Sequence, residues 1–210
     1  MTMRLLAQFF TALANPPRPP LSTRLAGPRV MLRAMKPSDG RAWRERRAAS
    51  RDFLVPWEPE WPDDCLTQPY FLRMLRRQDR EWQRGKAYAF GVFLQGRGKK
   101  NVLIGGVALN DARRGIAQKA TLGYWIGQDH AHRGFMTEAV GLACEFAFSA
   151  LKLHRLEASC LPHNEPSIRL LQRLGFEEEG YAKSYLRVNG LWQDHVLWGK
   201  IAPLGILGRD

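Results

Sequence analysis

The stretch Thr121–Ala139, TLGYWIGQDHAHRGFMTEA, predicts a strand that feeds a helix through a glycine-containing turn. Its first part, Thr121–Ile126, is uncharged and rich in β-branched and aromatic residues, as buried strands are. Gly134 then opens a mostly apolar helix that runs to about Lys152. The first amides of such a helix lack partners and point outward, so with the helix dipole they attract anions, most often phosphates. Arg133 adds a positive charge beside this predicted anion site.

Composition predicts one globular domain with a basic surface. The chain has 210 residues, of which 45% are hydrophobic and 25% charged. Its net charge is +12, from 32 Lys and Arg against 20 Asp and Glu. Such a surface either attracts polyanions, including acidic ligands, RNA and anionic membranes, or is simply solvated. No apolar run is long enough to span a bilayer, so we expect no membrane segment.

The cysteines and histidines predict neither disulfides nor a metal site. Cys65, Cys144 and Cys160 form no paired framework and no metal spacing, which favours free thiols in a reducing cytoplasm. We therefore expect a cytoplasmic protein. His130 and His132 have the spacing of a metal pair but lack further ligands nearby, so no metal is expected.

Residues 1–21 are predicted to be a helical extension and a proline-rich linker. Leu5–Ala14 reads as a short amphipathic helix. The alternative, a secretory signal, is disfavoured by its short apolar core, two polar interruptions and single preceding Arg. Asn15–Pro20, NPPRPP, forms a stiff extended linker. The domain proper then spans 22–202, and 203–210 is a C-terminal tail.

The remaining pattern predicts an α/β (α+β) domain with a mixed sheet between helices. The expected strands are 29–35, 87–94, 102–110, 116–126, 154–160, 176–188 and 192–201. A first helix is expected to begin at a cap on Ser38 or Asp39. Further helices are expected over 68–84, 134–152 and 164–174. Residues 53–62 read as a proline-punctuated loop, and Asn189-Gly190 as the turn of a final hairpin.

Two predicted helices carry basic stripes. One stripe is Arg41, Arg44, Arg47 and Arg51. The other is Arg73, Arg76, Arg77, Arg80 and Arg84, opposite Phe71, Leu75 and Trp82. These stripes are either solvent-exposed faces or a surface that binds a polyanion such as ribosomal RNA.

Several spaced motifs resemble the GNAT superfamily of N-acetyltransferases. They are Gly134-Phe-Met-Thr-Glu-Ala after a strand, Asn164-x-x-Ser and Leu174-Gly-Phe. Further segments are similar to the bacterial enzymes that acetylate the N-terminal alanine of a small-subunit ribosomal protein. These are Pro56-Trp-Glu-Pro, Gly105-Gly-Val, Leu161-Pro-His-Asn-Glu-Pro-Ser, Leu174-Gly-Phe-Glu-Glu-Glu-Gly-Tyr-Ala-Lys and Asp194-His-Val-Leu. The resemblance covers about residues 22–202.

The resemblance implies a twisted mixed sheet, flanked by helices, that binds acetyl-CoA between two splayed central parallel strands, here Thr121–Ile126 and His154–Cys160. The pantetheine arm would pair with the backbone of Tyr124, Trp125 and Ile126. Asn164 would hydrogen-bond the same arm, or act simply as a helix cap. The pyrophosphate would sit on the amides of His132, Arg133, Gly134, Phe135, Met136 and Thr137. This chain departs from the usual pattern at Ala131, where Gln or Arg is frequent, and at Met136, where Gly or Ala is.

The resemblance also implies that a neutral amine attacks the thioester directly, without an enzyme nucleophile. The amine must lose a proton and the CoA thiolate must gain one. An α-amine has a pKa of about 7.7–8.0, against about 10.4 for lysine, so an α-amine acceptor needs a strong base less. Many relatives carry a Glu where this chain has Thr121 and a Tyr where it has Leu171.

Three residues remain as catalytic candidates. Ser167 is a proton donor for the thiolate, or a serine in the first turn of a helix. Glu58 binds or deprotonates the incoming amine, or is an exposed loop residue. Asp194, with His195, acts through water or holds the last hairpin together.

Three functions fit these observations. The first is an acetyl-CoA-dependent transferase for the N-terminal alanine of a ribosomal protein, with the basic helices near rRNA. The second is an acetyltransferase for a small amine or an antibiotic. The third is a non-catalytic ribosome-assembly or RNA-binding factor that keeps the fold. An open acceptor groove favours the first function and a closed pocket the second.

Overall fold

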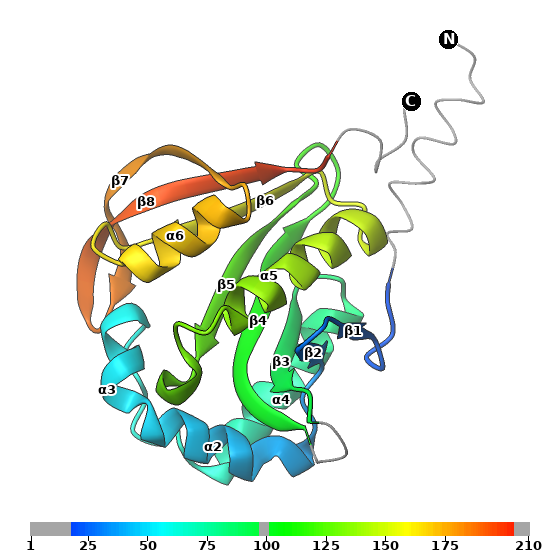
Figure 1. The fold of residues 1–210 in the computed structure, drawn as a ribbon, viewed down its shortest axis with the longest axis vertical. Coiled ribbons are helices and arrows are strands. Elements are labelled where there is room, and N and C mark those ends of the chain that lie inside the picture. The colour runs from blue at the N-terminus through cyan, green and yellow to red at the C-terminus, as the bar shows by residue number, and fades with distance from the viewer. Residues whose placement is uncertain (1–17, 97–100, 204–210) are drawn as a thin grey trace.

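The computed structural model describes residues 18–96 and 101–203, which form an eight-stranded mixed sheet with helices on both faces (Figure 1). The strands, in the spatial order β1-β2-β3-β4-β5-β6-β8-β7, are β1 (Arg24–Ala26), β2 (Val30–Arg33), β3 (Tyr88–Leu94), β4 (Val102–Arg113), β5 (Lys119–Ile126), β6 (Arg155–Cys160), β7 (Glu177–Val188) and β8 (Leu191–Ile201). The α-helices are α2 (Gly40–Ala49), α3 (Arg51–Leu54), α4 (Gln68–Gln83), α5 (Phe135–Glu145) and α6 (Glu165–Arg173). This architecture confirms the predicted α/β fold.

Some sequence predictions lie outside the described residues. They are the helix Leu5–Ala14, most of the linker that follows it, the tip of the turn between β3 and β4, and the C-terminal tail from residue 204. The division of the chain into extension, domain and tail therefore stays a prediction. Among the described residues, no helix is long and apolar enough to cross a membrane.

The two central strands are parallel and separate along their length. Every other neighbouring pair in the sheet is antiparallel. β5 and β6 pair only where Lys119–Thr121 lies beside Arg155–Glu157. Beyond those three residues the strands no longer pair, so their carboxyl ends stand apart. The predicted splayed pair of parallel strands is thus confirmed, and the gap that it opens positions the site.

The structure corrects several predicted boundaries. Part of the segment read as a loop is helical, as α3 and a 3-10 turn at Val55–Trp57, because buried Leu54 anchors it against the domain. The helix predicted to run from Gly134 to about Lys152 is α5 followed by a π-helical turn, Phe146–Ala150. β1 was not predicted, because three residues are too few to show a period.

Helices on the two faces bury two apolar clusters. On one face, α5 packs Ala139, Val140 and Ala143 against the sheet, and Leu171 of α6 joins the same cluster. On the other face, Trp43 of α2 and Phe71 and Leu75 of α4 pack with two strand residues, Phe93 and Leu103. The buried side of α4 matches the prediction, and its arginines lie on the exposed side.

The basic stripe of α2 is not a free cationic face. Arg47 is largely buried and forms an ion pair with Glu58. Arg41 is paired with Glu45 of the same helix, and Arg44 donates to the Gln68 side chain. The expectation that this whole stripe faces solvent or a polyanion is therefore corrected. The inward turn of Arg47 follows from an aromatic cluster beneath it.

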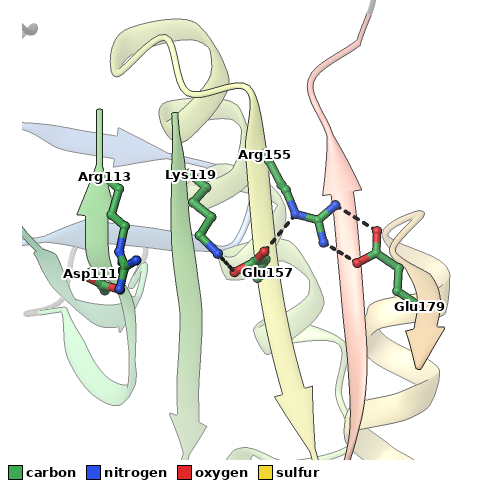
Figure 2. Close-up of polar contacts among 6 residues, drawn as sticks. All are labelled: Asp111, Arg113, Lys119, Arg155, Glu157 and Glu179. Carbon is green, nitrogen blue, oxygen red and sulfur yellow. Dashed lines mark hydrogen bonds and ion pairs between the residues drawn. The ribbon is translucent and has the colours of Figure 1, made fainter. Parts of the chain in front are cut away.

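An ion-pair network crosses the sheet from β5 to β7 (Figure 2). Glu157 accepts from Lys119 at 2.7 Å and from Arg155 at 2.9 Å, and Arg155 reaches over β8 to Glu179. Burial opposes ionisation of Glu157, but the two cations lower its carboxyl pKa. Gly199 of β8 lies under this bridge, and any side chain there would meet the Glu179 carboxylate. The network holds the separating strands at their paired end.

Candidate active site

A cavity of about 510 Å³ opens where β5 and β6 separate. Its walls come from β5, the loop before α5, the first turn of α5, β6, the start of α6 and the Trp57–Glu58 turn, and one residue of β8, His195, completes them. A second cavity of about 360 Å³ lies beside it, under the segment 58–66. The two cavities share Glu58, Gly123, Tyr124 and Trp125 as a common wall. The site therefore has two compartments that meet at the strand gap.

The amino end of α5 is open toward the first cavity. Gly134 is its N-cap residue, with φ +76°, and no side chain caps the first amides. His132, two residues earlier, also has a positive φ of +59°. A left-handed turn of this kind aims successive amides at one point, which makes the end of α5 a site for an anion. The geometry supports the predicted phosphate site, and Gly134 relieves the strain that another residue would carry there.

Arg29, at the edge of β2, supplies the cation that fixes this turn. It donates to the Arg133 carbonyl at 3.1 Å, and its guanidinium lies 4.9 Å from the centre of the Phe135 ring. Glu138 of α5 pairs with Arg29 at 2.9 Å and also accepts from the Arg29 and Val30 amides. Burial opposes ionisation of Glu138, but these hydrogen bonds lower its carboxyl pKa. The loop is thus tied to the first strands of the sheet.

Most of the predicted cofactor-binding residues line the first cavity. They are Tyr124, Trp125, Ile126, His132, Gly134, Phe135, Met136, Thr137 and Asn164. Arg133 is not among the lining residues, and its contribution is the carbonyl that holds Arg29. The Asn164 side chain accepts from the Ser167 amide at 3.2 Å, so it does act as the helix cap. Its contact with pantetheine stays a prediction.

Ser167 and Tyr124 form a polar pair inside the cavity. The Ser167 hydroxyl lies 2.6 Å from the Tyr124 phenol oxygen. Burial raises the Tyr124 pKa well above its usual value, so the phenol keeps its proton. The sequence placed no tyrosine at the α6 position where relatives carry one, but the fold brings one to α6 from β5. A linked serine and tyrosine can deliver a proton to a leaving thiolate.

Glu58 is held rigidly rather than exposed. Its carboxylate accepts two hydrogen bonds from the Arg47 guanidinium and one from the Trp61 indole at 2.8 Å. The guanidinium lies 4.3 Å from the Trp61 ring centre and 5.0 Å from that of Trp125. The alternative of a solvent-exposed loop glutamate is therefore wrong. A carboxylate with these partners is suited to attract an ammonium group more than to accept its proton.

Asp194 does not line either cavity. Its carboxylate accepts from the Tyr181 hydroxyl at 2.7 Å and from the Ser184 amide at 2.8 Å, within the β7–β8 hairpin. These hydrogen bonds lower the Asp194 pKa. The geometry supports the alternative that Asp194 holds the hairpin together. Its neighbour His195, by contrast, is buried and lines the first cavity.

No metal centre forms among residues 18–96 and 101–203, where no three His, Cys, Asp or Glu side chains gather to hold an ion. His130 instead contacts Asp129 at 2.8 Å. The three cysteines are free and buried, and burial raises the pKa of Cys144 to about 11 and that of Cys160 above its usual value. Buried thiols of this kind are poor nucleophiles.

Sequence reasoning missed three residues of this site. Arg29 gave no signal, because it lies just before β2, far from Gly134 in the chain. Arg47 was assigned to a basic stripe, although tryptophans at 57 and 61 hinted at an aromatic partner for a guanidinium. The Tyr124 side chain carries no sequence signal, because its partner Ser167 is 43 residues away in the chain.

A gap between parallel strands, open amides at the start of the following helix and the Ser167–Tyr124 pair between them are features that an acyl-transfer site for a phosphate-bearing thioester needs. A family model described as an acetyltransferase (GNAT) domain matches residues 29–177. The chain therefore belongs to the GNAT family of N-acetyltransferases.

The relatives agree with this assignment. The chain is 36% identical to an Escherichia coli enzyme named as an alanine N-acetyltransferase of ribosomal protein uS5. The alignment spans 188 residues, which are 89% of this chain and 94% of the relative. A Mycobacterium smegmatis RimJ structure, solved with CoA-disulfide, has 31% identity and a TM-score of 0.78, covering 90% of this chain and 86% of that one. A Vibrio fischeri ribosomal-protein-S5-alanine acetyltransferase has 29% identity and a TM-score of 0.78, covering 86% and 97%.

Proposed function

We propose that this N-acetyltransferase uses acetyl-CoA to acetylate the N-terminal α-amine, with alanine first, of a ribosomal protein. The relatives named for that reaction on uS5 match nearly their whole length, which supports the same substrate class here. Acetyl-CoA is the proposed cosubstrate because the CoA-bound relative shares the fold and the cavity ends at the open amides of α5.

A polypeptide acceptor is supported by the exposed rim of the β7–β8 hairpin, which consists of Tyr185, Leu191 and Trp192. Trp192 is 67% exposed. The turn beside it is fastened to the cavity, because the Asn189 amide donates to the Glu58 carbonyl at 2.8 Å. Exposed apolar side chains on such a hairpin bind partners larger than a small amine. The residues that follow the acetylated amine would lie on this rim.

Residues of the cavity take distinct roles in this proposal. The amides of His132–Thr137 bind the pyrophosphate, and the β5 edge at Tyr124–Ile126 pairs with pantetheine. The Glu58 carboxylate attracts the acceptor ammonium at the wall between the cavities. Ser167, with Tyr124 behind it, protonates the thiolate as the C–S bond breaks.

The test is mass spectrometry of acceptors incubated with the enzyme and acetyl-CoA. Peptides of one sequence should carry Ala, Ser, Met or Pro first, and a further peptide should have a blocked N-terminus and an internal lysine. Recombinant uS5, free and in small ribosomal subunits, forms the protein arm. We expect one acetyl group on the α-amine of the Ala peptide and of uS5. Acetylation of the lysine alone would refute the proposal.

The alternatives have their own readouts. Product from small amines or aminoglycosides, with none from peptides or uS5, would select the small-molecule acetyltransferase. Salt-sensitive RNA binding without any CoA binding would select the assembly factor. A further variant, Trp192→Ala, should raise KM for uS5 several-fold and leave the turnover of a short amine unchanged.

A further inference from the structure

His195 is a buried histidine in the wall of the first cavity, and the proposed function gives it no role. Only 3% of its surface is exposed. Its Nδ1 atom lies 2.9 Å from the Gln193 carbonyl oxygen. Because a carbonyl only accepts hydrogen bonds, Nδ1 carries the proton and Nε2 is left with a lone pair. Within residues 18–96 and 101–203, Nε2 has no hydrogen-bond partner and is not sealed in the interior.

The position of His195 is opposite the proton donor. Val196, the next residue of β8, pairs with Cys160 and packs in the cluster under α5 and α6. Successive side chains of a strand point to opposite faces, so His195 points to the other face. Tyr124 belongs to the α5 side of the sheet, and Ser167 is bonded to it there. Both His195 and Ser167 line the same cavity at the strand gap.

We propose that His195 Nε2 is the general base of the acetyl transfer. The neutral acceptor amine attacks the thioester carbonyl carbon, and the new N–C bond leaves the nitrogen cationic. Nε2 takes one proton from this nitrogen. The tetrahedral intermediate then collapses, the C–S bond breaks, and the thiolate receives a proton from Ser167. The imidazolium returns its proton through water, and Ser167 regains one, so the protons balance.

The other polar groups around His195 are less suited than its Nε2 atom to accept the proton of the amine. Tyr185 of β7 packs edge-on against the imidazole, with ring centres 5.8 Å apart. Asp194, beside it in the chain, is occupied by the hairpin hydrogen bonds, and Glu58 of the facing turn is occupied by Arg47 and Trp61. On the β6 side, Cys160 is a buried thiol that lies with Val196 in the cluster on the opposite face. Every carboxylate oxygen of Asp194 and Glu58 has a hydrogen-bond partner, whereas His195 Nε2 has none among the described residues.

This inference rests on N-acetyltransferase activity and not on which acceptor is natural, so it is tested with whichever amine in the panel above gives most product. The variants are His195→Gln and, as a matched control, His154→Gln, whose side chain is exposed at the start of β6 and outside the cavity. CoA affinity and thermal melting are measured for each variant. We expect His195→Gln to lose about 100-fold in kcat or more, as removal of a general base does. His154→Gln should match the unaltered enzyme.

Three further readouts separate a base from a structural histidine. After correction for the neutral fraction of the amine, the rate of the unaltered enzyme should fall at acidic pH, and this dependence should vanish in His195→Gln. Added imidazole should restore activity to His195→Ala. Retention of full activity by His195→Gln, or a loss without change of pH profile and without imidazole rescue, would overturn the assignment. If the variants fail to fold, nitrogen NMR of the unaltered protein decides, because a proton on Nε2 in place of Nδ1 refutes it.

Discussion

Replacing Ser167 with alanine tests the proton-donating pair most directly. The change removes a 2.6 Å hydrogen bond and leaves the phenol of Tyr124 buried without its partner. An unsatisfied buried hydroxyl costs about 1–3 kcal/mol of unfolding free energy. For a domain of this size, each kcal/mol lowers the melting temperature by about 2–4 °C, so we expect a fall of about 2–12 °C.

The catalytic effect should be far larger than the loss of stability explains. If Ser167 protonates the thiolate, its removal should lower kcat by about 100-fold, the lower end of general-acid catalysis. Tyr124→Phe keeps the serine hydroxyl and should lose less, about tenfold. Because the two hydroxyls act as one unit, the double variant should be no slower than Ser167→Ala alone. CoA affinity should stay within about twofold of the unaltered value, since the pyrophosphate contacts are elsewhere.

The assay is steady-state release of CoA thiol, at saturating acetyl-CoA and well below the melting temperature of each variant. Ser149→Ala is the matched control, because that hydroxyl donates to the Glu145 carbonyl on an exposed turn. A Ser167→Ala variant that turns over within threefold of the control would refute the proton-donor role. Strict additivity of the two rate losses would contradict the idea of a linked pair.

Other changes probe the anion site and the sheet. Gly134→Ala forces a side chain into φ +76°, which costs about 1–2 kcal/mol and should weaken CoA binding about tenfold by calorimetry; an unchanged Kd would contradict the strain. Gly199→Ala should displace the Glu179 carboxylate from Arg155 and lower the unfolding free energy by about 0.5–1 kcal/mol, a loss that Glu179→Ala in the same chain should partly reverse. The pKa of Glu138 is lower in the folded protein than in the unfolded chain, where it is about 4.5. Its contribution to stability is therefore complete above the unfolded pKa and is lost as pH falls through the folded pKa. The stability difference between the unaltered protein and Glu138→Gln in urea should therefore shrink from pH 5 to pH 3, and a constant difference would exclude this linkage.

The part of the cavity wall around the start of α5 was predictable because it is built from local backbone. A strand, a turn with one obligatory glycine and the first turn of a helix are contiguous in the chain, so Thr121–Ala139 contains nearly all of it. The structure places nine of the ten predicted cofactor residues in the cavity wall. Only Arg133 is absent from that wall, and its backbone carbonyl accepts a hydrogen bond from Arg29.

The acceptor side was less predictable because it is assembled from distant segments. Glu58 looked like an exposed residue, since the sequence gives no sign that Arg47 folds inward across an aromatic cluster. Asp194 and His195 are adjacent in the chain, yet strand alternation sends one into the hairpin and the other into the cavity. The sequence shows Asp194 and His195 side by side, but only the register of β8 against β6 decides which of the two side chains faces the cavity.

Because the acceptor side is assembled from distant segments, the chain can lack the Glu and Tyr that many relatives carry. Thr121 still pairs beside the parallel strand, opposite Glu157, but that carboxylate is committed to Lys119 and Arg155 and serves the sheet. The phenol comes from Tyr124 on β5, and the candidate base comes from His195 on β8. If backbone contacts hold the thioester, they fix the positions at which a proton donor and a proton acceptor are needed. They do not fix which strand provides those side chains. Loss of one family residue therefore argues against turnover only if no other side chain can take over its proton, and Tyr124 and His195 are the candidates that line the cavity here.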